Sequence, residues 1–289
     1  MTRTLFRAGH LAQVTGAELA DGRRAVIKIR PRDARIAGCA AVQAHLAAAG
    51  FPCPVPLAGP AEEGRYAITA EAYLPGGTQL PPSHGAAPFA VLLARLVALA
   101  PPVGSIPALA TSPPWAAWDH PGSRLWPDRD DQGRDLNHTH GPAWIDTAAA
   151  QVRRRLRTCA GQARAGHGDW ESQNIRWADG QPHAVHDWDS VIAQPEIVIA
   201  GLASAVWPAT GDPGEAATIQ QSADFLAHYQ TATGRRWDQR QTQYAWAAGL
   251  WVRLFNAKKD AAGGGGPQLD LLASQITERL ARAGLLPTR

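Results

Sequence analysis

Cysteine is scarce in this chain of 289 residues, and its spacing excludes two classes of stabilising site. Only three cysteines are present, Cys39, Cys53 and Cys159, and no two of them form a Cys-x-x-Cys pair. An odd number of widely spaced cysteines argues against a disulfide framework and against a cysteine-ligated zinc site. The histidines, His138 and His140 included, have no third partner at ligand spacing, so no zinc site is expected.

Long apolar runs are also missing. The longest run, residues 86–100, is interrupted by Arg95 and is shorter than the ~20 residues that cross a bilayer. The N-terminal Met-Thr-Arg-Thr-Leu-Phe-Arg lacks the apolar core of a signal peptide. We therefore expect a cytoplasmic protein without a membrane partner.

Charge is modest, because charged residues make up 18% of the chain and the net charge is +3. No basic stripe alternates with aromatic residues, and the arginine run at 153–157 is expected to be a solvated helix face, so no nucleic-acid partner is predicted. The distribution is uneven: residues 1–50 hold eight Lys and Arg against three Asp and Glu, whereas residues 161–230 hold two against nine. The basic part suits a polyphosphate, and the acidic part suits a divalent cation, a cationic substrate, or both.

The first 75 residues predict a small antiparallel sheet with one helix. Strands are expected at 12–19 and 24–29, joined by a turn with an Asp-Gly signal, and again at 66–73. Apolar residues at helical spacing predict a helix over 33–49, with Gly50 as its stop. Pro52, Pro54 and Pro56 are expected to force an extended segment.

After Pro75-Gly76-Gly77 the pattern becomes mainly helical. Helices are expected in the segments 89–99, 145–156, 215–230, 238–257 and 268–284. The chain therefore divides into a small N-terminal lobe, 1–75, and a larger helical lobe, 76–289, within an α+β fold. Residues 101–142 show no sustained period, and their Trp115, Trp118 and Trp126 either join the core or line a substrate pocket.

The strongest motif begins at His167 and reads His-Gly-Asp-Trp-Glu-Ser-Gln-Asn. Asp169 and Asn174 lie five residues apart, and Asp187 follows at the end of a short predicted hairpin over 175–186. Phosphoryl transfer needs such a set, with one carboxylate for the attacking hydroxyl and an amide plus a second carboxylate for Mg²⁺. Asp189 is either a second metal contact or a helix N-cap, and Glu171 is expected to be solvent-exposed.

Lys28 completes this set from the other end of the chain. It ends the run Ala-Val-Ile-Lys on a predicted strand, where its amine can reach the α- and β-phosphates of a nucleotide. The order Ala-Val-Ile-Lys, His-Gly-Asp-x₄-Asn and His-Asp-Trp-Asp resembles the aminoglycoside phosphotransferase and choline kinase-like small-molecule kinases. The resemblance implies their bilobal, protein-kinase-like fold.

The same resemblance implies a role for each matching residue. Asp169 would be the catalytic base, Asn174 and Asp187 would bind Mg²⁺, and Lys28 would bind the phosphates. His167 would be the structural histidine of the catalytic loop. The strand at 66–73 resembles the family's hinge, where backbone groups of Glu71, Ala72 and Tyr73 would meet the base of the nucleotide.

The sequence departs from the family pattern in three places. The helix over 33–49 has no glutamate to pair with Lys28, and the candidate positions are Cys39 and Gln43, of which Gln43 could hydrogen-bond the lysine. No G-x-G-x-x-G is present, and Gly9 alone is suitably placed for the phosphates. Gly201-Leu202-Ala203 stands where the family often starts a helix with Asp-Leu-Ala.

We therefore expect a phosphotransferase that moves the γ-phosphoryl group of ATP or GTP to a hydroxyl of a small molecule. The acidic segment and the habit of the family favour an antibiotic acceptor, such as an aminoglycoside or a basic peptide. One alternative is a metabolic kinase for an amino alcohol or a sugar. Another is a catalytically inactive, nucleotide-binding pseudokinase or scaffold, which the missing helix glutamate suggests. The sequence does not indicate an oligomeric state.

Overall fold

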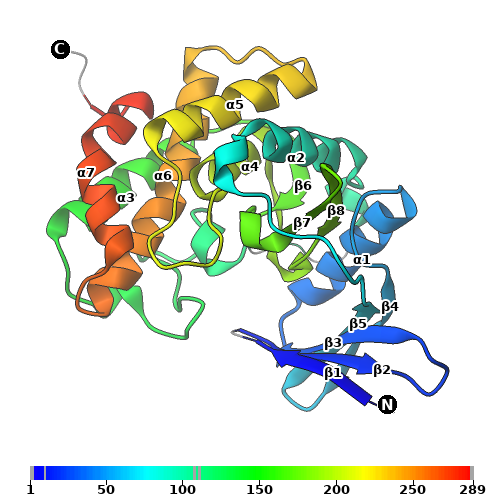
Figure 1. Cartoon of the computed structure of the whole chain (residues 1–289). Coiled ribbons are helices and arrows are strands. Elements are labelled where there is room, and N and C mark those ends of the chain that lie inside the picture. Colours follow the sequence, from blue (N-terminus) through cyan, green and yellow to red (C-terminus); the bar gives the residue numbers. More distant parts are fainter. Residues whose placement is uncertain (1–2, 10, 107–108, 110–111, 287–289) are drawn as a thin grey trace.

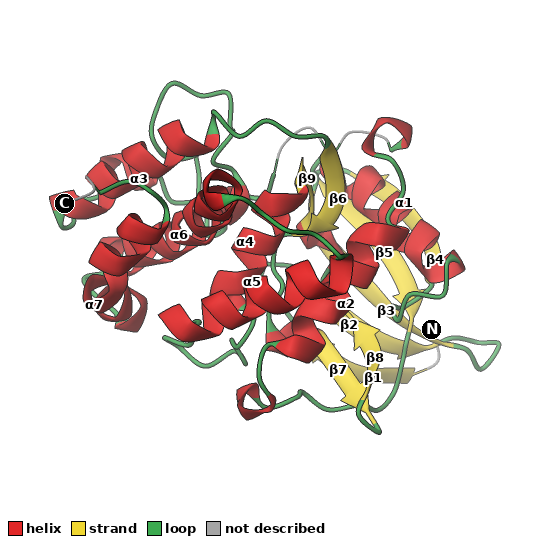
Figure 2. Cartoon of the chain, turned by 90° about the horizontal axis from the view of Figure 1, so that it is seen from above, coloured by secondary structure: helices red, strands yellow, loops and turns green. Residues whose placement is uncertain are grey.

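The computed structural model describes residues 3–9, 11–106, 109 and 112–286. Its strands gather on one side and most of its helices on the other, which gives two lobes of unequal size (Figures 1 and 2). The chain thus has the bilobal α+β architecture expected from its sequence. None of the helices in the described part of the chain is both long and apolar enough to span a membrane.

The small lobe is an antiparallel five-stranded sheet in the order β1-β2-β3-β5-β4. Its strands are β1 (Arg3–Ala8), β2 (Gln13–Glu18), β3 (Arg24–Pro31), β4 (Pro56–Glu63) and β5 (Tyr66–Ala72). The prolines of residues 52–56 were expected to give only an extended segment, but Pro56 begins β4. This strand lies at the edge of the sheet, where a missing amide hydrogen breaks no interior ladder.

Helix α1 (Arg35–Ala48) is inserted between β3 and β4 of this sheet. Gly50 follows it with a φ of 76°, and its amide donates to the Ala47 carbonyl, 3.1 Å away, as the Phe51 amide does to Leu46, 2.9 Å away. This is the left-handed stop that the sequence predicts. The buried face of α1 includes Ile36, Cys39 and Gln43.

The large lobe is mainly helical. Its helices are α2 (Ala87–Leu99), α3 (Ala143–Leu156), α4 (Glu196–Val206), α5 (Ile219–Thr233), α6 (Gln239–Ala262) and α7 (Pro267–Arg282). Helix α5 starts later than expected because the Thr218 hydroxyl and the Gln221 side chain cap it reciprocally. Asp238 and Gln241 cap α6 in the same way.

Helix α4 is the helix of the large lobe that the sequence pattern did not reveal. Nearly all of its side chains are buried, so it lacks the polar face that gives a helix its period. Gly201 lies in the middle of α4 rather than at its start, which corrects the expected correspondence with Asp-Leu-Ala. A Cβ there would lie 2.2 Å from the Ala245 carbonyl oxygen of α6, so glycine permits the close approach of the two helices.

Two short two-stranded sheets flank the segments that carry the motifs. One pairs β6 (Ala163–His167) with β9 (Val191–Pro195), and the other pairs β7 (Ile175–Ala178) with β8 (Gln181–Val185). Asp179 and Gly180 form the predicted turn between β7 and β8, with φ values of 51° and 72°. We retain the lobe division at residues 75–77 as a proposal; it lies between β5 and α2.

The sequence predicts a solvated helix face for the arginine run at 153–157, but only part of the run is solvated. Arg153 is buried, and its guanidinium donates to the carbonyls of Trp118, 2.8 Å away, and His120, 2.7 Å away. It thereby holds the irregular segment that precedes α3 against the helical core. Arg154, its neighbour, is exposed as predicted.

Candidate active site

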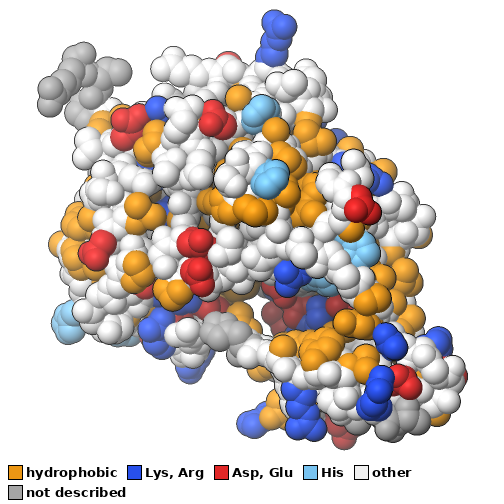
Figure 3. Space-filling model, in the orientation of Figure 1, with side chains coloured by type: hydrophobic (Ala, Val, Ile, Leu, Met, Phe, Trp, Pro, Cys, Tyr) orange, Lys and Arg blue, Asp and Glu red, His pale blue; other side chains and the backbone are white. Residues whose placement is uncertain are grey.

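The space-filling view shows a hollow between the two lobes with acidic and basic side chains at its floor (Figure 3). Asp169 lies in the loop after β6, Asp187 follows β8, and Asp187 is close enough to Asp169 to raise its pKa. The fold therefore brings together the two segments that carry the motifs, although 18 positions separate these aspartates in the sequence.

Asp169 and Asn174 are in direct contact. The Asn174 amide nitrogen donates to the Asp169 carboxylate and to the Asp169 carbonyl, each 2.9 Å away. Because the nitrogen is used in this way, the amide oxygen is the atom that Asn174 can offer to a metal ion. The loop thus fixes the carboxylate and an oxygen ligand relative to each other.

His167 holds this loop from beneath, in the structural role that the resemblance implies. It is fully buried, and burial lowers the pKa of its imidazole, so the ring is neutral at pH 7. The Asp169 amide donates to its Nδ1 over 3.2 Å, and therefore its Nε2 carries the proton and donates to the His186 carbonyl, 3.0 Å away. One ring thereby links the Asp169 loop to the residue that precedes Asp187.

Asp187 has a left-handed backbone, with a φ of 61°, which aspartate tolerates better than most residues. Its Oδ2 accepts a hydrogen bond from the Ser190 hydroxyl over 2.8 Å, and its carbonyl accepts one from the Ser190 amide over 3.1 Å. The Asp187 carboxylate is close enough to Asp169 to raise the pKa of that residue.

Negative charge accumulates here without enough positive charge to balance it. Removal from water, and then repulsion by Asp187, raise the pKa of Asp169 to about 7. Burial and the nearby Asp169 also raise the pKa of Glu171, which is half-buried rather than solvent-exposed as expected. Repelling carboxylates with a free amide oxygen are a donor set that fits Mg²⁺.

No group of three or more His, Cys, Asp or Glu side chains is arranged to hold a metal alone, as far as the described residues extend. Asn174 and Asp187 would therefore need further oxygen ligands. Nucleotide phosphates and water are the usual source of such ligands for Mg²⁺. The assignment of these two residues as metal ligands remains a prediction.

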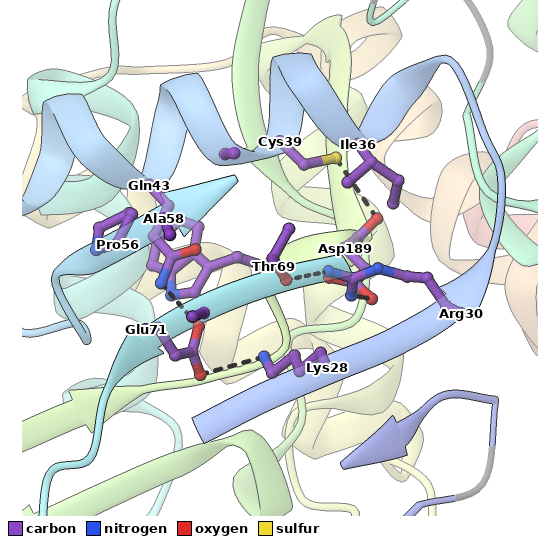
Figure 4. A pocket seen from close by; sticks show the side chains of 13 residues that line it. Lys28, Arg30, Ile36, Cys39, Gln43, Pro56, Ala58, Thr69, Glu71 and Asp189 are labelled. Atoms are coloured by element: carbon purple, nitrogen blue, oxygen red, sulfur yellow. Dashed lines mark hydrogen bonds and ion pairs between the residues drawn. The ribbon is translucent and has the colours of Figure 1, made fainter. Parts of the chain in front are cut away.

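Lys28 lies across the hollow on β3, paired with Glu71 of β5 at 3.1 Å (Figure 4). Gln43 of α1 does not bond the lysine, as had been considered, but donates to Glu71 over 2.9 Å. Cys39, the other candidate, is directed to the carbonyl of Asp189. The ion-pair partner of Lys28 is therefore Glu71. This pairing was missed because the partner was expected on the helix.

The hinge prediction also changes in detail. The Ala72 amide donates to the Val55 carbonyl over 2.8 Å, and the Tyr73 amide donates to the Arg24 carbonyl over 3.1 Å. Both donors are therefore engaged within the sheet, which corrects any role for them in binding the base. Contact through the carbonyls of Ala72 and Tyr73 stays a prediction.

Gly9 lies in the turn between β1 and β2, where a phosphate-binding loop is expected. Its φ is 148°, and a Cβ there would lie 2.0 Å from the Ala12 carbonyl oxygen, so the turn excludes other residues. Its contact with nucleotide remains a prediction.

Asp189 is not a helix N-cap, because it lies within the short helical turn Trp188–Ser190. Its role as a second metal contact stays a prediction. Its carboxylate forms an ion pair with Arg30 of β3, and its carbonyl accepts from Arg35 of α1 over 3.1 Å. Asp189 lies two residues after Asp187, so this pair ties the proposed metal loop to the small lobe. The physical reason is the cost of leaving the buried Arg30 guanidinium unpaired.

The three tryptophans of the irregular segment take different positions. Trp118 and Trp126 are buried, and Trp126 packs on Trp251 of α6 with ring centroids 5.2 Å apart. Trp115 is half-buried, and its indole nitrogen donates to the Gly168 carbonyl, 2.9 Å away and one residue before Asp169. Of the three, Trp115 is the one that reaches the site.

Asp131 and Lys259 form a pair that sequence reasoning missed. They lie 2.6 Å apart, on the loop before α3 and on α6, and both influence the ionisation of Asp169. Neither belongs to a motif, and 128 positions separate them in the sequence. Only the folding of α6 against the irregular segment could have revealed them.

Comparison with known proteins agrees with this geometry. The sequence model of the family described as "Phosphotransferase enzyme family" matches residues 2–242. No curated protein matches the sequence at the threshold applied.

Solved structures with the same fold include several antibiotic kinases. The amicoumacin kinase hAmiN, in complex with AMP-PNP, Ca²⁺ and Ami, is 12% identical, with a TM-score of 0.66 over 98% of this chain and 89% of that one. A thermostable mutant of aminoglycoside phosphotransferase APH(4)-Ia, with ADP and hygromycin B, is 14% identical, with a TM-score of 0.60 over 100% and 95%. Spectinomycin phosphotransferase APH(9)-Ia, with ADP and spectinomycin, is 13% identical, with a TM-score of 0.52 over 99% and 89%. At these identities the likeness shows the fold alone.

Proposed function

We propose a function for this chain, which belongs to the phosphotransferase enzyme family. The protein transfers the γ-phosphoryl group of ATP or GTP to a hydroxyl group of a small molecule. The observation that supports this proposal is the contact between Asp169 and Asn174, with Asp187 close enough to raise the pKa of Asp169, in a chain whose Lys28 amine is buried beside Glu71.

Each residue has a distinct part in the proposed mechanism. Asp169 orients the acceptor hydroxyl and takes its proton as the oxygen attacks the γ-phosphorus. Its raised pKa makes its carboxylate a stronger base than an ordinary aspartate. Lys28 donates to the α- and β-phosphates, and Asn174 and Asp187 would hold Mg²⁺. When bound, the metal ion neutralises the charge that develops on the leaving phosphates.

The surroundings of Asp169 support a cationic acceptor. Asp187 and Asp131 act electrostatically on Asp169, and Asp169, Asp187 and Glu215 act on Glu171. Lys259 acts on Asp169 in the opposite direction, and it is paired with Asp131. An amine-bearing antibiotic, such as an aminoglycoside or a basic peptide, would meet a complementary potential here. The fold shared with antibiotic kinases supports the same class.

A mass-shift screen tests the proposal. The protein is incubated with Mg²⁺, ATP or GTP, and a panel of hydroxylated amine antibiotics, amino alcohols and sugars. We expect one compound to gain a single phosphoryl group with the unaltered protein and none with Asp169→Asn. Phosphorylation of an amino alcohol or a sugar instead would favour the metabolic alternative. Nucleotide binding without any turnover, on acceptor or water, would contradict the enzyme and favour a pseudokinase.

A further inference from the structure

Two residues on adjacent strands of the small lobe form a pair that the helix of that lobe was expected to provide. Lys28 of β3 stands opposite Thr69 of β5 in the antiparallel register, and Glu71 stands opposite Val26. Lys28 and Glu71 are therefore diagonal neighbours on one face of the sheet, a spacing that long side chains bridge. Their charged atoms, Nζ and Oε1, are 3.1 Å apart (Figure 4).

Both charges are almost removed from solvent. The side chain of Lys28 is 11% exposed and that of Glu71 is 9% exposed. The second carboxylate oxygen of Glu71 accepts from the Gln43 amide over 2.9 Å, and Gln43 in turn donates to the Pro54 carbonyl over 2.9 Å. Each oxygen of the carboxylate thus has its own partner, and the carboxylate has a single fixed orientation.

Helix α1 offers no acidic side chain to the lysine. Its residues, Arg35–Ala48, include neither Asp nor Glu, and its contribution to the pair is the neutral amide of Gln43. A carboxylate on a helix would approach and leave the lysine as the helix moves. Here cation and carboxylate share one hydrogen-bonded sheet, and α1 contributes the neutral Gln43 amide that orients the carboxylate.

We propose that Glu71 is the positioning residue of Lys28, and that Gln43 orients Glu71 from the helix. An ammonium group has three donors, so Lys28 can keep one hydrogen bond to Glu71 while it offers the others to nucleotide phosphates. Glu71 itself does not touch the reacting atoms. This inference rests on the proposed function, because it assigns a residue to the phosphate-binding step of that reaction.

The test compares Glu71→Gln with a variant that carries both Gln43→Glu and Glu71→Gln. Glu71→Gln leaves the shape of the side chain but removes the charge beside Lys28. The double variant moves the negative charge from position 71 to position 43 on α1. The neutral side chain at position 71 then stands between that charge and Lys28. Glu63→Gln, on an exposed position of the edge strand β4, is the matched control. For each variant, kcat and KM for nucleotide, the Kd of ADP and of adenosine, and the midpoint of unfolding are measured.

We expect Glu71→Gln to lower kcat about 100-fold, the size of effect that follows a misplaced group of ~1 Å. The Kd of ADP should rise while that of adenosine, which has no phosphate, stays unchanged. A residue with only a structural role would not separate these two ligands. The double variant should regain the midpoint of unfolding but keep a kcat roughly tenfold or more below the unaltered protein, because its charge stands one hydrogen bond away.

Three results would overturn the inference. The first is a folded Glu71→Gln variant with unaltered kcat and ADP affinity. The second is a double variant with full activity, which would mean that the helix serves as well as the strand. If Glu71→Gln does not fold, the double variant alone decides. The third is an unaltered protein that binds no nucleotide, which would overturn the proposed function as well, whereas the first two leave that function intact.

Discussion

The two sides of the hollow treat charge in opposite ways. On the small lobe each functional cation has a partner: Lys28 pairs with Glu71, and Arg30 pairs with Asp189. On the large lobe Asp169, Glu171 and Asp187 gather with little compensation, and the pKa of Asp169 rises to about 7. The paired side is built to hold a fixed geometry, whereas the unpaired side is built to receive positive charge from outside.

This difference in charge pairing indicates which side of the hollow depends on bound ligands. A buried ion pair contributes little net stability, but removing one partner leaves an uncompensated charge that costs much more. Repelling carboxylates lower stability until a cation binds, and binding to the folded state then stabilises it. We therefore expect changes on the large lobe to affect turnover most, and changes on the small lobe to affect both stability and turnover.

Asp169→Ala should break the acidic side most severely. Loss of a positioned general base costs about 10²- to 10⁴-fold in rate, and the nucleotide contacts proposed for the other residues remain. Steady-state kinetics with the acceptor found by the screen, together with the Kd of nucleotide, check this. Asp270→Ala, on the exposed first turn of α7, is the control. Near-normal turnover in the Asp169 variant would reject its assignment as the base.

Asp189→Asn should break the ion pair between Arg30 of the small lobe and Asp189 of the large lobe. It leaves the guanidinium of Arg30 buried without its counter-charge, and we expect a loss of about 3 kcal/mol in the free energy of unfolding. Denaturant unfolding measures this. A second variant, with Arg30→Met and Asp189→Leu, should be close to neutral because it buries no unpaired charge. Equal destabilisation of both variants would show that shape, rather than charge, governs this contact.

Arg153→Ala extends the comparison to a buried cation that is satisfied by carbonyls instead of carboxylates. Its removal leaves the carbonyls of Trp118 and His120 without donors, so we expect a loss of about 2 kcal/mol in the free energy of unfolding. Arg154→Ala changes the exposed neighbour on the same helix and should stay within about 0.5 kcal/mol. Similar values for the two variants would contradict the clamping role of Arg153.

Trp115→Phe should have the smallest effect, since it removes one neutral hydrogen bond to the Gly168 carbonyl. Such a bond contributes about 1 kcal/mol, which corresponds to about a fivefold fall in kcat if it orients the Asp169 loop. The unfolding midpoint should change little. A fall comparable with that of Asp169→Ala would mean that Trp115 also contacts the acceptor.

Elements of both lobes could be predicted where local signals exist. The helix stop at Gly50, the hairpin turn at Asp179 and Gly180, and the loop that places Asn174 beside Asp169 all follow from short-range patterns. Helix α4 escaped prediction because burial on every side removes its period. Strand β4 escaped because prolines are tolerated only at an edge, and which strand lies at the edge is decided by the sheet.

Sequence alone determined the order of the functional groups, because the lysine, the catalytic-loop aspartate and the metal-loop aspartate are recognised by their immediate neighbours. Tertiary structure decided their partners: Glu71 for Lys28, Arg30 for Asp189, and Lys259 for Asp131. These partners lie 43, 159 and 128 positions apart in the sequence. They pair because burying a charge without a partner costs free energy, and not because of their spacing along the chain. That selection takes place only when strands, helices and loops have closed around the charge.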